Sequence, residues 1–154
     1  MREDFEKLVD KDKHQVFVMM CPASIPFSFL RHLWIVTNKK GQLSRWEVRH
    51  YRNKNRTLGY LHLNEQPPFK GIYRFLFIKN HFFWNPKLVG KIEGDEDGTA
   101  KKIVEFIEKS KESYTYLNTY FPTGPNSNTY VNWILKNFPE FKIKLPWGCI
   151  GKNY

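Results

Sequence analysis

The chain has 154 residues, of which 41% are apolar and 17% aromatic, and its 25 lysine and arginine residues against 15 acidic ones give a formal net charge of +10. This length is typical of one domain, in which folding buries roughly two-thirds of the surface that the unfolded chain exposes. Cys21 and Cys149 are too few and too far apart for a disulfide framework or a zinc site, so we expect a reducing, cytoplasmic setting and no metal or other cofactor. The longest early apolar run, residues 16–21, is too short for a signal peptide or a membrane span.

The first thirteen residues are highly charged, with Phe5, Leu8 and Val9 at helical spacing. We expect a helical or frayed segment over residues 1–13, followed by a single domain over residues 14–154.

The first half of the domain reads as strands. Residues 15–20 form an apolar run that two prolines end, and residues 32–38 and 44–51 predict a hairpin in which Gly41 supplies a positive φ. The partner of His32 depends on the register of this hairpin. A turn centred near residue 41 places His50 opposite His32, whereas a tighter turn moves it towards Glu47 or Val48.

The second half adds short strands and two helices. We expect strands at residues 58–63, 72–78, 87–92 and 141–145, although a helix is also compatible with residues 72–78. Thr99 is the expected cap of an amphipathic helix over residues 100–112, and a second helix is expected over residues 129–138. The acidic cluster at residues 93–98 lacks the ligand order of a calcium loop and predicts a turn. The fold class is therefore α+β, with an antiparallel sheet packed against two main helices.

The stretch from Gly124 to Phe138 places a polar cluster at the start of a core helix. Asn126 or Ser127 can cap the free N–H groups there, which is the usual role of such residues. A helix N-terminus also stabilises an anion or a deprotonated nucleophile, so Ser127 is at a position that favours a nucleophile. The N–H groups around residues 126–128 are placed to bind an oxyanion.

Three stretches together resemble an uncharacterised bacterial domain family with a GPNSNT and IGK(D/N)Y signature. They are residues 31–36, the string GPNSNT at 124–129, and the ending at 145–154, which has Cys149 where alanine is usual and Asn153 where aspartate is usual. The resemblance covers roughly residues 20–154 and implies no established activity.

A more distant similarity is to the permuted papain-like proteins, the NlpC-type and lecithin-retinol acyltransferase-like group, in which a histidine strand precedes an Asn-Cys motif at a helix start. This resemblance implies a permuted papain-like fold with His32 as general base and Ser127 in the place of the cysteine. A serine hydroxyl is a far weaker acid than a thiol, so it needs a hydrogen-bonded His32 and a third group, Glu47 or His50, to orient that histidine. The site would then either perform serine chemistry or bind without cutting.

Aromatic and basic residues suggest further contacts. We expect Trp34, Tyr116 and Tyr120, with Asn126 and Asn128, to bind an unknown small-molecule, peptide or acyl ligand. Residues 31–56 contain eight lysines and arginines against one acid, a local charge of +7 that suits an anionic polymer or surface, or simply a solvated face. Three functions stay open: a ligand-binding domain with little or no turnover, a hydrolase or acyltransferase using Ser127 and His32, and a nucleic-acid or anionic-surface binder.

Overall fold

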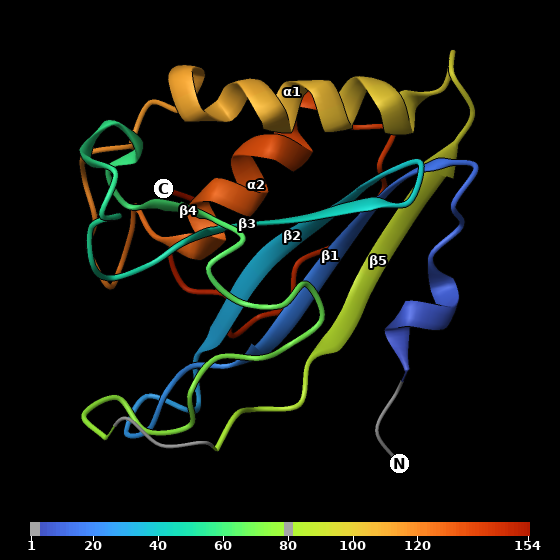
Figure 1. The fold of residues 1–154 in the computed structure, drawn as a ribbon. Coiled ribbons are helices and arrows are strands. Elements are labelled where there is room, and N and C mark those ends of the chain that lie inside the picture. The colour runs from blue at the N-terminus through green and yellow to red at the C-terminus, as the bar shows by residue number, and fades with distance from the viewer. Residues whose placement is uncertain (1–3, 79–81) are drawn as a thin grey trace.

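The computed structural model describes residues 4–78 and 82–154, and its centre is a five-stranded antiparallel sheet covered on one face by two helices (Figure 1). The sheet order is β4-β3-β2-β1-β5. The strands are β1 (His14–Pro22), β2 (Arg31–Lys39), β3 (Gln42–Val48), β4 (Leu61–Leu63) and β5 (Lys87–Gly94). The helices are α1 (Thr99–Ser113) and α2 (Ser127–Asn137), with short 3-10 helices η1 (Phe5–Leu8) and η2 (Arg56–Leu58). The predicted α+β class, with its antiparallel sheet and two packed helices, is confirmed.

The two central strands are apolar on both faces because both faces are covered. Leu33 and Ile35 of β2 pack in the main core between the sheet and the two helices. Trp34 and Val36 point to the other face, where they pack with Phe5 of η1 and, through the chain between β4 and β5, with residues such as Phe69. Successive side chains in a strand point to opposite faces, so each residue of β2 belongs either to the helix-covered face or to the other face.

The β2–β3 hairpin closes with a two-residue turn. Lys39 pairs with Gln42, and between them Lys40 and Gly41 have φ values of 50° and 90°. Positive φ at both central residues matches the right-handed twist of the paired strands, and it confirms the role expected for Gly41. This register is neither of the two expected ones: continued from the pair of Ile35 and Trp46, it places Arg49 opposite His32. Glu47 lies diagonally from His32 on the same face, and its side chain, rather than that of His50, contacts His32.

Two predicted strands are absent from the described residues. Residues 72–78 form only isolated bridges, one of them between Ile25 and Phe75. The next N–H that could extend that bridge, that of Phe27, donates instead to the Ser24 carbonyl. Residues 141–145 pair with no strand; Phe141 packs in the main core and Ile143 lies against Gly90, so their alternation reflects packing over the sheet rather than edge pairing.

Several boundaries also differ from the expectation; the second strand of the hairpin is residues 42–48 rather than 44–51, and the second helix is residues 127–137 rather than 129–138. The predicted strand at 58–63 shortens to β4, because η2 and a glycine with φ of 55° at position 59 occupy its start. Gly98, not Thr99, is the N-cap of α1, and Thr99 is its first helical residue.

Candidate functional site

The α2 helix begins with a complete capping box. The side-chain oxygen of Asn126 accepts hydrogen bonds from the backbone N–H groups of Asn128, at 2.9 Å, and Thr129, at 3.3 Å, while the Thr129 hydroxyl accepts from the Asn126 N–H at 3.0 Å. Of the two residues considered as caps, Asn126 therefore has this role, and Ser127 is the first residue of the helix.

The amide groups at the start of α2 also bind the late segment of the chain. Asn128 Nδ2 donates to the carbonyl oxygens of Ile150, at 2.8 Å, and Arg31, at 2.9 Å, and Thr129 Oγ1 donates to the carbonyl of Gly151 at 2.7 Å. A Cβ at Gly151, where φ is +86°, would lie 2.5 Å from Asn126, so this close approach requires glycine. Asn126 and Asn128 were predicted to bind a ligand, but these hydrogen bonds connect α2 with β2 and with residues 150–151.

Ser127 and His32 are not joined by a hydrogen bond. The Ser127 side chain is 6% exposed and has no hydrogen-bond partner among the residues that the structure describes. Leu33 faces α2, and the neighbouring His32 therefore points to the opposite face of the sheet. The ring of His32 lies there, 6.0 Å from the ring of Trp34. The structure therefore places the two proposed catalytic side chains against different layers near one end of β2.

His32 belongs to a buried cluster centred on Glu47. His32 Nε2 lies 3.0 Å from Glu47 Oε2, Arg45 donates to the same oxygen at 2.9 Å, and Arg49 donates to Oε1 at 3.1 Å. Glu47 is 1% exposed, Arg45 0% and Arg49 8%. The cluster forms because β3 places Arg45 and Glu47 on the face that His32 shares and Arg49 follows directly after the last residue of that strand, while Trp46 and Val48 enter the main core.

Burial and charge set the protonation of this cluster. Burial alone would raise the pKa of Glu47, but the hydrogen bond from His32 and the charges of Arg45 and Arg49 outweigh it and hold that pKa well below its ordinary value of 4.5. Burial lowers the pKa of His32 from 6.5, an effect that the two arginines strengthen and Glu47 opposes. At pH 7 the cluster therefore contains a carboxylate, a neutral imidazole and two guanidinium groups.

The guanidinium groups keep unused donors. Arg45 Nη1 donates to the Pro67 carbonyl at 2.9 Å and to that of Lys70, whereas its Nε is buried without a partner. Arg49 forms one side-chain hydrogen bond, to Glu47, and its guanidinium lies 5.1 Å from the ring centre of Tyr51. Among the described residues, the other two nitrogens of Arg49 have no hydrogen-bond partner, and neither is sealed from solvent.

Among the other predicted residues, Trp34 is fully buried. Its indole N–H donates to the Pro68 carbonyl at 2.9 Å and the Arg45 guanidinium lies 4.4 Å from its ring centre, so it is part of the core. His50 is exposed and lies against Tyr51; it is within electrostatic range of His32 but forms no hydrogen bond to His32 or Glu47 among the described residues.

The two tyrosines before α2 are half-buried. Tyr116 packs against Tyr154 at 5.4 Å and Tyr120 against Tyr60 at 5.6 Å between ring centres. Burial raises the pKa of Tyr120, and the charge of Arg49 opposes that rise. Tyr120 therefore lies within electrostatic range of the cluster, whereas no interaction among the described residues links Tyr116 to it.

The basic run at residues 31–56 does not form one surface. Arg45 and Arg49 are buried, and the nearby lysines pair with acids: Lys39 lies 3.1 Å from Glu108, and Lys40 contacts Glu96. The exposed remainder is Arg52, Lys54 and Arg56 around η2. Within residues 31–56, the exposed basic side chains that are not paired with an acid are therefore confined to that short loop.

A shallow, open hollow of about 370 Å³ lies elsewhere, along the far half of α2. It is lined by Asn132, Leu135, Lys136, Pro139, Phe141, Lys142, Ile143 and Lys144. Over residues 4–78 and 82–154, no three histidine, cysteine or acidic side chains gather closely enough to hold a metal ion. Within the same ranges, no helix is long and apolar enough to cross a membrane.

The comparison that decides the family is a match to the model described as "Protein of unknown function (DUF3750)", which covers residues 14–154. The chain belongs to the DUF3750 family. No curated protein and no solved structure matches it. The residues that sequence reasoning missed in this DUF3750 domain are Arg45 and Arg49, whose signal was their position on the same strand face as Glu47.

Proposed function

We propose that the domain binds a ligand carrying an anionic group, a carboxylate or a phosphate, at Arg49 and His32, without turning it over. The observation that carries the proposal is the charge balance of the Glu47 cluster: two buried guanidinium groups face one buried carboxylate. Burying an uncompensated charge is costly, and an anion at Arg49 would relieve that cost.

Arg49 is suited to this role because its unused nitrogens are those that reach solvent. A guanidinium offers five N–H donors in a planar fork that matches carboxylate and phosphate oxygens. Glu47 holds one side of the fork and so fixes the direction of the other. His32 lies on the same carboxylate and has Nδ1 without a partner among the described residues, so the imidazole can contribute a second polar contact.

The nearest competing acid is already engaged. Glu65 lies within electrostatic range of Arg49, accepts a hydrogen bond from the Tyr51 hydroxyl at 2.9 Å, and lies 2.5 Å from His62 Nδ1. His62 Nε2 lies 2.9 Å from the Tyr51 carbonyl oxygen. Glu65 is thus engaged by Tyr51 and His62 and forms no hydrogen bond to Arg49 among the described residues.

The test compares stabilisation of the protein by sulfate, phosphate and acetate with that by chloride at equal ionic strength, using Tm and calorimetric titration. A ligand that binds only the folded state stabilises it by RT ln(1 + [L]/Kd), so an anion at tenfold its Kd adds about 1.4 kcal/mol. Arg49→Gln should remove the anion-specific rise in Tm, and Arg49→Lys serves if the glutamine variant does not fold. The matched control is Arg52→Gln, on an exposed arginine, which should retain it. Equal responses in wild type and Arg49→Gln, or none in either, would refute the proposal.

A serine hydrolase or acyltransferase with a permuted papain-like arrangement is the second candidate. It is supported by the orientation of His32 by Glu47, by the neutral state of that imidazole, which a general base requires, and by the unbonded hydroxyl of Ser127 at a helix start. It requires that hydroxyl to reach His32 Nδ1, a contact that the present arrangement lacks. A fluorophosphonate probe should then label wild type but neither Ser127→Ala nor His32→Gln, with Ser113→Ala as the matched serine control. Labelling that persists in His32→Gln excludes the dyad.

A further inference from the structure

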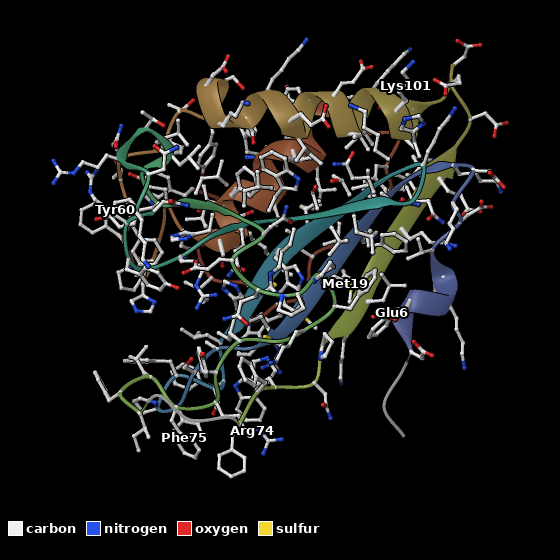
Figure 2. The ribbon with its side chains drawn as sticks, in the orientation of Figure 1. Glu6, Met19, Tyr60, Arg74, Phe75 and Lys101 are labelled. Carbon is white, nitrogen blue, oxygen red and sulfur yellow. The ribbon has the colours of Figure 1, made fainter. Side chains whose placement is uncertain are left out.

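Large apolar side chains are exposed together at one end of the molecule. Phe29 is 65% exposed, Phe77 85% and Trp147 88%, and four further residues are at least 37% exposed: Ile25, Phe27, Phe75 and Phe82. We call these seven residues the aromatic tip. Figure 2 shows Arg74 and Phe75 at the end of the molecule far from α1.

Backbone hydrogen bonds hold the segments of the aromatic tip together. The Ile25 N–H donates to the Arg74 carbonyl at 2.7 Å, and the Arg74 N–H donates to the Phe82 carbonyl at 2.9 Å. The Arg31 N–H donates to the Gly148 carbonyl at 2.9 Å, which places Trp147 beside the start of β2. The exposed rings are therefore presented by a hydrogen-bonded framework rather than by separate loop ends.

The surroundings of the aromatic tip are basic. The sequence contains no aspartate or glutamate at residues 13–46, 66–92 or 141–154, the segments that supply all of the aromatic tip. The same segments supply Arg31, Lys70, Arg74 and Lys87, of which Lys87 is exposed. The Arg74 guanidinium lies 4.9 Å from the Trp84 ring centre and the Lys70 ammonium 3.6 Å from that of Phe83. These two rings follow Phe82 directly in the chain and Arg74 precedes Phe75, so both cations lie next to the aromatic tip.

We propose that the aromatic tip inserts shallowly into the surface of a phospholipid bilayer that contains anionic lipids. Tryptophan and phenylalanine at a lipid–water boundary bury apolar area, and lysine and arginine beside them are attracted to anionic headgroups. This chemistry favours a membrane over a second copy of the chain, because two copies that each carry a net charge of +10 and meet through basic ends would repel.

The test is co-sedimentation of the full chain with vesicles of phosphatidylcholine alone and of phosphatidylcholine with 30% phosphatidylserine. Wild type should bind the mixed vesicles more tightly, and Phe77→Ser/Trp147→Ser should lower the partition coefficient at least tenfold. The matched control is Phe121→Ser, on a ring that is 56% exposed outside the aromatic tip. Lys87→Gln should weaken binding to the mixed vesicles by roughly fivefold. Arg49→Gln should bind vesicles like wild type, which separates this proposal from that of the anion site.

A second readout is tryptophan emission. Trp147 is the most exposed of the described apolar residues, so its emission should shift to shorter wavelength on vesicle binding, and the shift should shrink in Trp147→Phe. Three outcomes overturn the proposal: no sedimentation with either vesicle, sedimentation that the tip variants leave unchanged, and a concentration-dependent dimer, measured by light scattering, that the tip variants abolish in the absence of vesicle binding. In the last case the aromatic tip is a contact between copies.

Discussion

Replacing Glu47 by glutamine tests whether the buried charge cluster is held by its carboxylate. Glutamine keeps the shape of the side chain and a polar contact to His32, but it removes the charge between Arg45, at 2.9 Å, and Arg49, at 3.1 Å. Because both guanidinium groups stay buried, the free energy of unfolding should fall by about 3–5 kcal/mol, the range seen when one partner of a buried ion pair is removed.

The measurement is urea unfolding at pH 7 followed by circular dichroism and fluorescence. The matched control is Glu108→Gln, which breaks the exposed pair with Lys39 and should cost less than about 1 kcal/mol. Sulfate or phosphate should restore part of the loss in Glu47→Gln, because the variant cluster has gained positive charge. If Glu47→Gln is as stable as Glu108→Gln, the cluster contributes little and the reasoning is wrong.

The pH dependence of stability gives an independent check. The pKa of Glu47 is lowered in the folded state, so its contribution is complete above its unfolded pKa of 4.5 and is lost as the pH falls below it. The pKa of His32 is also lowered in the folded state, so below pH 6.5 the unfolded state binds a proton that the folded state does not. The free energy of unfolding therefore also decreases as the pH falls through this range. Glu47→Gln should flatten the curve below pH 4.5. A curve as steep as that of wild type would contradict the assignment.

Three further predictions concern the helices and the cysteines. Asn126→Ala removes the cap of α2 and its bonds to residues 122 and 150, so it should cost about 2 kcal/mol in urea unfolding, whereas the exposed Asn137→Ala should cost under about 0.5 kcal/mol. Tyr130→Phe removes a fully buried hydroxyl that bonds a serine of α1 at 2.8 Å, and a loss of about 1 kcal/mol is expected in the same assay; no loss would mean that this bond is energetically neutral. Burial raises the pKa of Cys21 to about 12 and that of Cys149 to about 11, and both are 1% exposed, so Ellman's reagent should react with neither in the native protein and with both in urea; rapid reaction of either in the native protein would contradict this.

The strands of the sheet other than the shortened β4, and both helices, could be predicted because apolar runs or a helical repeat mark each one locally. The hairpin at Gly41 is an example: a glycine between two strand-forming runs fixes the turn locally. The prediction of a strand at residues 72–78 was wrong because the apolar residues of this segment cover the sheet or belong to the aromatic tip. Composition alone does not distinguish such a segment from a hydrogen-bonded strand.

The candidate site was predictable in part. His32 and Glu47 were both named, but the register is neither of the two considered, because the two-residue turn at Lys40 and Gly41 places Arg49 opposite His32 and Glu47 diagonal to it. Arg45 and Arg49 were counted as surface charge, because a basic run does not indicate which of its arginines are buried. Here both are buried in ion pairs with the carboxylate of Glu47. The partners of Asn126 and Asn128 were missed because residues about 22 to 97 positions away supply them.

The binding of residues 150–152 by the start of α2 has a consequence for the order of synthesis. The helix is complete at residue 137, yet the carbonyl groups that its asparagine and threonine side chains require emerge from the ribosome later. Until then Asn128 has only the Arg31 carbonyl of β2 to bond, and the hydroxyl of Thr129 lacks its acceptor at Gly151. The start of the helix is then held by part of its final set of hydrogen bonds. Docking of α2 should therefore be among the last steps of folding on the ribosome, and nascent chains stalled before residue 150 should be cut readily by proteases between β5 and α2.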